Sequence, residues 1–206
     1  MIRAVVSDFG GVLTTPLLKG FERFQADTGV PAEAFGAALA HAAAGDDGRN
    51  PLFELEVGAI PEAEFLATLE RELGAVVGRP VTLHGFGERY MTALDANEEL
   101  FAYYRALHAR GLRFALLTNN VREWEPLWRA KLPVDEICET VVDSAFVGLR
   151  KPDPATTRSC SNGSGCRPRP ASSSTISRST SRPRRRSDSR PCTSVRPVRR
   201  STSSTR

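Results

Sequence analysis

The chain has 206 residues, of which 28 are Lys or Arg and 24 are Asp or Glu, and it is long enough to bury a core of its own. No apolar run is long enough to cross a bilayer and no signal segment is recognisable, so we expect a cytoplasmic protein without a membrane partner. The four cysteines have neither paired spacing nor nearby histidines, which argues against a zinc site or a disulfide framework.

The first predicted element is a short strand in the stretch "AVVSDFGGVL", residues 4–13. Its β-branched run has no helical periodicity, and Asp8 follows at its carboxyl end with Gly10 and Gly11 just behind. In open α/β sheets ligands bind beyond the carboxyl ends of the strands, so Asp8 is a candidate functional residue. A solvated aspartate in a turn is the alternative.

Helical patterns follow. The spacing of apolar residues predicts helices over 17–29, 31–45, 60–74, 84–94 and 97–111, with turn-rich segments such as "GDDGRN" between them. The most amphipathic of these covers 60–74, where Phe65, Leu66, Leu69 and Leu73 share a face.

Strand patterns return after residue 111. "LRFALLTNN" predicts a buried strand over 112–117 that ends in Thr118, Asn119 and Asn120, and a short helix with two tryptophans follows. "ICETVVDS" predicts another strand, and "GLRKPDP" predicts a loop that carries Lys151. One strand, a block of helices and then strand–helix–strand together indicate an α/β core with a helical insertion.

The strand ends bring three chemical groups to one edge of such a sheet. If the strands are parallel, Asp8, Thr118 and Lys151 converge there. A carboxylate can accept a phosphoryl group, a threonine hydroxyl can hold a phosphate oxygen, and a lysine cation balances the charge. Gly10 and Gly11 would let backbone N–H groups approach the phosphate. Each residue taken singly has an alternative interpretation: Thr118 could cap a helix, Lys151 could be an ordinary loop lysine, and Asn119 could be a turn residue.

Three stretches, "SDFGGVL", "LLTNN" and "GLRKPDP", resemble in this order the first three motifs of the haloacid dehalogenase-like (HAD) hydrolase superfamily. The branch that looks nearest contains sugar-phosphate phosphatases and the phosphatase domain of soluble epoxide hydrolases. The resemblance implies a Rossmann-like parallel-sheet core over 1–14 and 96–154, with a helical cap over 15–95.

The same resemblance implies roles for the site residues. Asp8 would be the nucleophile, and Thr118 and Lys151 would bind phosphate, with Gly10, Gly11 and Asn119 beside them. The cofactor would be Mg²⁺, held partly by Asp8 and the carbonyl of Gly10, and the partner a small phosphorylated metabolite. Two departures stand out: Gly10 replaces the usual second aspartate, a general acid worth about 10²–10⁴-fold, and nothing after Pro154 supplies the family's fourth, acidic motif.

Residues 155–206 differ in character from the rest of the chain. They contain 13 Arg and one acid, Asp188, whereas residues 1–154 contain 15 Lys or Arg and 23 Asp or Glu. The segment has no Leu, Phe, Tyr, Trp or Met, so we expect a disordered Arg/Ser-rich tail. Binding of nucleic-acid phosphates is an alternative, but regular Arg-Ser dipeptides and aromatic residues that stack on bases are missing, so we expect no nucleic-acid partner.

A shifted reading frame after Pro154 would explain this break. A shifted frame joins the last base of each codon to the first two bases of the next. If Ser174, Thr175 and Ile176 are encoded by TCG, ACG and ATC, the shifted codons are GAC and GAT, which both encode aspartate. Extended on this principle, "SSSTISRSTSRP" permits the peptide "VFDDLEVNVEA", which reads as a strand ending in an acid pair. Without it, the sheet would lose an edge partner and leave apolar surface exposed.

Three functions therefore stay open at the level of sequence. The first is a Mg²⁺-dependent phosphomonoester hydrolase that acts through an aspartyl-phosphate. The second is a hydrolytic 2-haloacid-type dehalogenase, in which the aspartate attacks carbon. The third is a catalytically inactive binding protein, because Gly10 stands in place of the acid and the fourth motif is missing.

Overall fold

Three parallel strands form the sheet that carries the candidate site in the computed structural model, which describes residues 3–45 and 49–161. They are β1 (Ala4–Ser7), β2 (Arg113–Thr118) and β3 (Cys138–Asp143), in the order β1-β2-β3. The register pairs Ser7 with Leu116 and Thr118 with Asp143, so all three strands end at the same edge. The predicted α/β fold with a parallel sheet is therefore confirmed.

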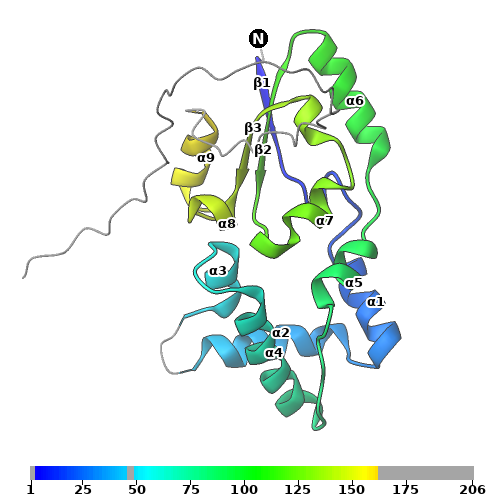
Figure 1. Cartoon of the computed structure of the whole chain (residues 1–206), viewed down its shortest axis with the longest axis vertical. Helices are drawn as coiled ribbons and strands as arrows, with labels where there is room; N and C mark the ends of the chain where they lie inside the picture. Colours follow the sequence, from blue (N-terminus) through cyan, green and yellow to red (C-terminus); the bar gives the residue numbers. More distant parts are fainter. Residues whose placement is uncertain (1–2, 46–48, 162–206) are drawn as a thin grey trace, which may run out of the picture. The chain divides into compact units, whose positions relative to one another are not determined.

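The helices fall into two groups along the chain. Those between β1 and β2 are α1 (Leu18–Thr28), α2 (Ala32–Ala43), α3 (Pro51–Glu56), α4 (Glu62–Val77), α5 (Phe86–Thr92) and α6 (Glu98–Ala109). Those after β2 are η1 (Arg122–Trp124), α7 (Glu125–Arg129), η2 (Val134–Glu136), α8 (Ser144–Val147) and α9 (Pro154–Ser161). Figure 1 shows α1–α5 gathered beyond the carboxyl ends of the strands, while α6 lies alongside the sheet. None of the helices in the described part of the chain is long and apolar enough to span a bilayer.

Local sequence signals explain where these helices begin and end. Gly29 closes α1 with a left-handed φ of 71°, as the sequence predicts. The helix predicted over 60–74 continues past Gly74 and ends before Gly78, which takes the left-handed conformation instead. Helix α3 is not among the predicted helices, although Asn50 caps it by accepting the N–H of Leu52 and proline occupies its first turn.

The chain leaves the sheet and returns to it at two neighbouring points. Thr14 and Ala96 form an antiparallel bridge, and the N–H of Asn97 donates to the carbonyl of Leu13 at 2.9 Å. The N–H of Thr15 donates to the carbonyl of Asp95 at 2.9 Å. We call residues 15–95, whose helices include α1–α5, the cap segment. It shares one apolar cluster with the sheet, so its separation as a domain of its own stays a prediction.

Aromatic side chains dominate the interior of the cap segment. Phe21, Phe24 and Phe35 meet with ring centroids 5.0–5.4 Å apart, and Phe86 and Tyr90 extend the cluster from α5. Such large side chains bury much apolar area each and hold short helices together that would not be stable alone.

Among the described residues, the second face of the sheet is covered by a helix over β2 and β3. Helix α9 packs on β2 and β3, where Leu117 and Val142 form a small apolar cluster. In the described ranges β1 pairs only with β2, and the side chain of Val6 is 51% exposed. A β-branched residue of this kind normally lies buried in a parallel sheet, so the β1 edge exposes apolar surface.

Helix α9 corrects the expectation that residues from 155 onward lack structure. The Asp153 carboxylate accepts the N–H of Ala155 at 2.7 Å, and Pro154 opens the helix, which continues to Ser161. Asp-Pro is a good helix start, and it lies before the change in composition. The rest of the predicted tail, residues 162–206, lies outside the described residues.

Candidate active site

The candidate site centres on an ion pair between two of the predicted residues. Asp8 directly follows β1, and its Oδ2 lies 2.6 Å from Nζ of Lys151. Its Oδ1 accepts the N–H of Phe9 at 2.7 Å, which fixes the carboxylate orientation. The Asp8 side chain remains 40% exposed, so an incoming group can reach it. A carboxylate held beside a lysine cation at a strand end is thus in place.

Asn119 holds Lys151 in this position. Its Oδ1 accepts the backbone N–H of Lys151 at 2.8 Å and its Nδ2 donates to the carbonyl of the same residue at 3.1 Å. The Lys151 ammonium also donates to the carbonyl of Leu117 at 3.1 Å. Because the Asn119 amide is engaged in this way, it positions Lys151, and its predicted contact with substrate stays a prediction.

The remaining predicted residues divide into two groups. Thr118 is 1% exposed at the end of β2 and lines the same cavity as Gly10. Gly11 does not line it; it is exposed, and its N–H donates to Oγ1 of Thr14 at 3.0 Å. Its φ of 75° explains why a glycine stands there. Its predicted role in phosphate binding stays a prediction.

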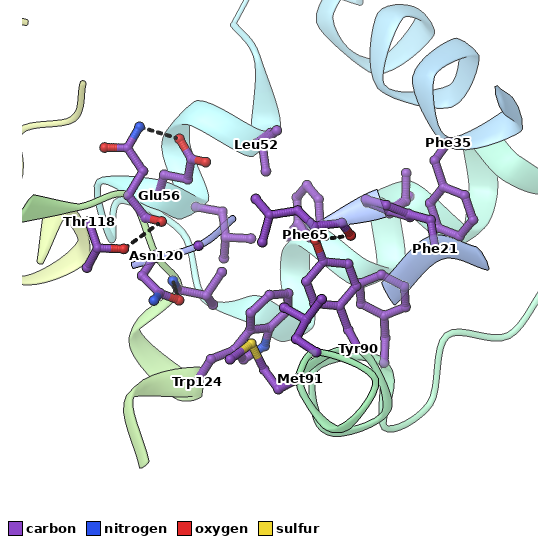
Figure 2. A pocket seen from close by; sticks show the side chains of 18 of the residues that line it. Phe21, Phe35, Leu52, Glu56, Phe65, Tyr90, Met91, Thr118, Asn120 and Trp124 are labelled. Atoms are coloured by element: carbon purple, nitrogen blue, oxygen red, sulfur yellow. Dashed lines mark hydrogen bonds between the residues drawn. The ribbon is translucent and has the colours of Figure 1, made fainter. Parts of the chain in front are cut away.

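A cavity of about 250 Å³ lies next to these residues, between the sheet edge and the cap segment. Figure 2 shows its two ends: Thr118, Glu56 and Asn120 at one, Phe21 and Phe35 at the other. Each of the helices α1–α5 contributes to its wall, and the loop after β2 closes it with Val121 and Trp124. Strand ends and cap helices together therefore line the space beside Asp8.

No protein-family model matches the sequence, and no curated protein matches it. Solved structures do match. A predicted HAD-like family hydrolase from Porphyromonas gingivalis is 23% identical with a TM-score of 0.52, over 82% of this chain and 78% of that chain. A HAD family enzyme from Bacteroides thetaiotaomicron is 20% identical with a TM-score of 0.57, over 81% and 80%. An L-2-haloacid dehalogenase is 22% identical with a TM-score of 0.51, over 76% and 70%. The chain has the HAD-like hydrolase fold.

One residue in the site of this HAD-like fold is not predicted from the sequence. Glu56 stands at the end of α3, and its Oε2 lies 2.6 Å from Nε of Arg150, the residue that precedes Lys151. The same oxygen lies 3.5 Å from Nδ2 of Asn119, and the Arg150 guanidinium stacks over Phe53. This cluster ties the cap segment to the lysine loop. No spacing in the sequence links a glutamate to an arginine 94 positions later, so only the folded chain shows it.

Cys138 can be excluded as a nucleophile in this HAD-like fold. Burial raises the pKa of its thiol to about 12. The thiol therefore stays protonated near neutral pH, and the thiolate is the reactive form. Asp8, whose carboxylate is accessible at the strand end, therefore stays the candidate nucleophile.

Two oxygen donors at the strand edge are of the kind that magnesium takes, and their role as ligands stays a prediction. Mg²⁺ usually takes one or two carboxylates together with phosphate oxygens and water. The Asp8 carboxylate and the Gly10 carbonyl, both predicted ligands, belong to one short loop after β1. Over residues 3–45 and 49–161, no three His, Cys, Asp or Glu side chains gather where they could hold a metal ion. An ion bound by these described residues would take most of its ligands from phosphate and water.

A second carboxyl lies at the strand edge, at the end of β3. Asp143 is 5% exposed, and burial raises the pKa of its carboxyl from 3.8 to about 6. The N–H of Ala145 donates to its Oδ1 at 3.0 Å and lowers this pKa, whereas Glu125 raises it. The side chain therefore caps α8 at the cost of holding a buried charge at neutral pH.

Asp143→Asn should change how the free energy of unfolding depends on pH. Because the pKa of this acid is raised on folding, its contribution to stability falls as the pH rises from about 4 to about 6. At pH 7 the parent chain bears a cost of about 3 kcal/mol that the Asn variant lacks. Urea unfolding of both proteins near pH 4 and pH 7 should show their difference shifting by roughly this amount in favour of the variant. A difference independent of pH would contradict the assignment.

Proposed function

We propose that the chain is a hydrolase of phosphate monoesters that acts through an aspartyl-phosphate on Asp8. The observation that carries the proposal is the 2.6 Å pair of Asp8 and Lys151, next to a cavity that Phe9, Gly10 and Thr118 help to line. The HAD-like fold supports it, and the Bacteroides thetaiotaomicron enzyme has been crystallised with magnesium and inorganic phosphate. The small phosphorylated partner and the cytoplasmic location are part of this proposal.

The chain's own groups suffice to describe the two steps. A carboxylate oxygen of Asp8 forms a bond to phosphorus while the bond from phosphorus to the ester oxygen breaks, and the leaving alkoxide takes a proton from water. Water then attacks the phosphorus of the acyl-phosphate, which releases phosphate and restores the carboxylate. Lys151 balances charge on the phosphoryl oxygens, and the Thr118 hydroxyl donates to one of them. A magnesium ion, when bound, would supply further positive charge at these oxygens.

Gly10 restricts the reaction to certain substrates. A side-chain acid at this position would protonate the leaving oxygen, and a glycine cannot do so. Esters whose alcohol leaves readily as an anion, such as aryl phosphates, should therefore be hydrolysed faster than alkyl esters of similar size. Positioned proton transfer is worth about 10²–10⁴-fold, which sets the scale of the difference.

Dehalogenation is the second candidate, because an L-2-haloacid dehalogenase shares the fold and the cavity is mainly apolar. In that reaction the Asp8 carboxylate would displace halide from carbon. Assays of phosphate release from p-nitrophenyl phosphate and of halide release from 2-chloropropionate, each with and without a chelator, separate the two. Phosphate release that the chelator suppresses supports the first proposal, and halide release supports the second.

Lys151→Ala should lower phosphate release by about 10²–10³-fold, the scale found for single groups that stabilise transition-state charge. The matched control is Lys131→Ala, which removes a half-buried lysine outside the site. Its rate should stay within about twofold of the parent rate, since isolated surface charges contribute little. Equal effects of the two variants would contradict the role of Lys151.

A further inference from the structure

The cavity beyond the reacting groups offers few polar contacts to a ligand. Phe21, Phe35, Leu39 and Leu52 are among the apolar side chains that line it, and Figure 2 shows Phe21 and Phe35 at the end away from Thr118. The polar members of the lining stand mostly at the strand edge, where the phosphoryl group would bind. The leaving group of a phosphate ester held at Asp8 would therefore occupy apolar surroundings.

Tyr90 and Trp124, two polar side chains of the wall, each donate a hydrogen bond to protein. The Tyr90 hydroxyl donates to the carbonyl of Leu17 at 3.0 Å, and burial raises the pKa of this phenol to about 12, which keeps it neutral. The Trp124 indole donates to Oε1 of Glu62 at 2.7 Å. Gly87 makes room for this indole, because a Cβ there would strike it. The Glu56 carboxylate is paired with Arg150.

Ligand hydroxyls would lose their water at this wall and find few partners. Each hydroxyl buried without a partner lowers affinity by about tenfold or more. An apolar group of the same size gains affinity because its surface leaves water. At about 250 Å³, the cavity has room for roughly eight molecules of liquid water, which suits one aromatic ring or a short branched chain.

From this geometry we infer that the site takes phosphate monoesters of a small apolar alcohol or phenol, not of a sugar or other polyol. The inference rests on the proposed function and names its substrate class. It depends on the wall made by α1–α5, whereas the proposed function depends on Asp8 and Lys151, so the two can fail separately.

Binding of phosphonates tests the inference without chemistry, because the carbon–phosphorus bond is not hydrolysed. The probes, titrated into the full chain, are benzylphosphonate, 2,3-dihydroxypropylphosphonate and methylphosphonate. Calorimetry measures their affinities, and a second titration follows tryptophan fluorescence, to which Trp124 in the cavity wall contributes. Benzylphosphonate should bind at least about tenfold more tightly than either of the others. Equal or tighter binding of the dihydroxypropyl compound, or no binding of any, overturns the inference. If the affinities follow the expected order but p-nitrophenyl phosphate releases no phosphate, the proposed function is overturned and the inference about the cavity stands.

A pair of leucine variants locates the binding. Leu52 on α3 lines the cavity, whereas Leu66 on α4 is equally half-buried but does not line it. Leu52→Gln should weaken benzylphosphonate binding by about tenfold and leave methylphosphonate binding unchanged, while Leu66→Gln should change neither. Equal effects of the two substitutions would place the apolar contact elsewhere and overturn the inference.

Discussion

Asp8→Asn should abolish hydrolysis, with a fall in rate of at least about 10⁴-fold, as for other covalent nucleophiles. The amide cannot form an acyl-phosphate, and it removes the negative charge that lies 2.6 Å from Lys151. The fold should survive, because the Asn Oδ1 can still accept the N–H of Phe9 and the lost ion pair is 40% exposed on the Asp8 side. An ion pair of that exposure contributes about 0–1 kcal/mol.

The matched control for this variant is Asp95→Asn. Asp95 also lies near a lysine, with 3.7 Å between its Oδ2 and Nζ of Lys19, but away from the cavity. Phosphate release and urea unfolding are measured for both variants and the parent. Near-parent stability in both, with activity lost in Asp8→Asn alone, fits the nucleophile assignment. Substantial turnover by Asp8→Asn would show that the nucleophile lies elsewhere.

The sequence alone predicts the sheet edge well, for identifiable reasons. The apolar runs before Asp8 and Thr118 are short, the first of them is β-branched, and the helical block between them requires a crossover. Parallel strands then place both residues at one edge, and the Asp8–Lys151 pair lies there as a parallel sheet requires. Local pattern and topology therefore carry this part of the site.

Other parts of the site depend on contacts that no local pattern encodes. Asn119 follows a strand and resembles a turn residue, yet its amide holds the backbone of Lys151. Helix α3 has a good start signal at Asn50, but it lies in a segment of turn-forming residues that masks it. Glu56 and the apolar wall become visible only when helices distant in sequence pack together. Likewise, Asp143 gains its raised pKa from burial, which its neighbours in sequence do not indicate.

The exposed edge of β1 bears on the reading-frame hypothesis. Strand β1, which leads to Asp8, has one partner among the described residues, and its Val6 side chain is 51% exposed. An additional strand beside β1 would pair its free edge, and the connection to such a strand could cover the exposed Val6 side chain. In the peptide that the shifted frame permits, two acids follow the strand pattern, just as Asp8 follows β1.

A chain whose frame is restored after Pro154 should therefore hydrolyse phosphate esters about 10²-fold or more faster than the 206-residue chain, with Mg²⁺ required. Magnesium demands oxygen ligands in near-octahedral geometry, and Asp8 is a single carboxylate. In the sequence, Asp188 is the one acid after Pro154, and it stands among arginines with no apolar run before it. Phosphate release by both chains, with and without chelator, measures the difference.

The control is the restored chain with both recovered aspartates changed to asparagine, which keeps the added strand but not its charges. If this control matches the restored chain in rate, the gain comes from stability and not from metal binding. If the 206-residue chain matches the restored chain, the frameshift hypothesis is wrong. If neither chain releases phosphate or halide, the remaining function is that of a catalytically inactive binding protein, which Gly10 already allows.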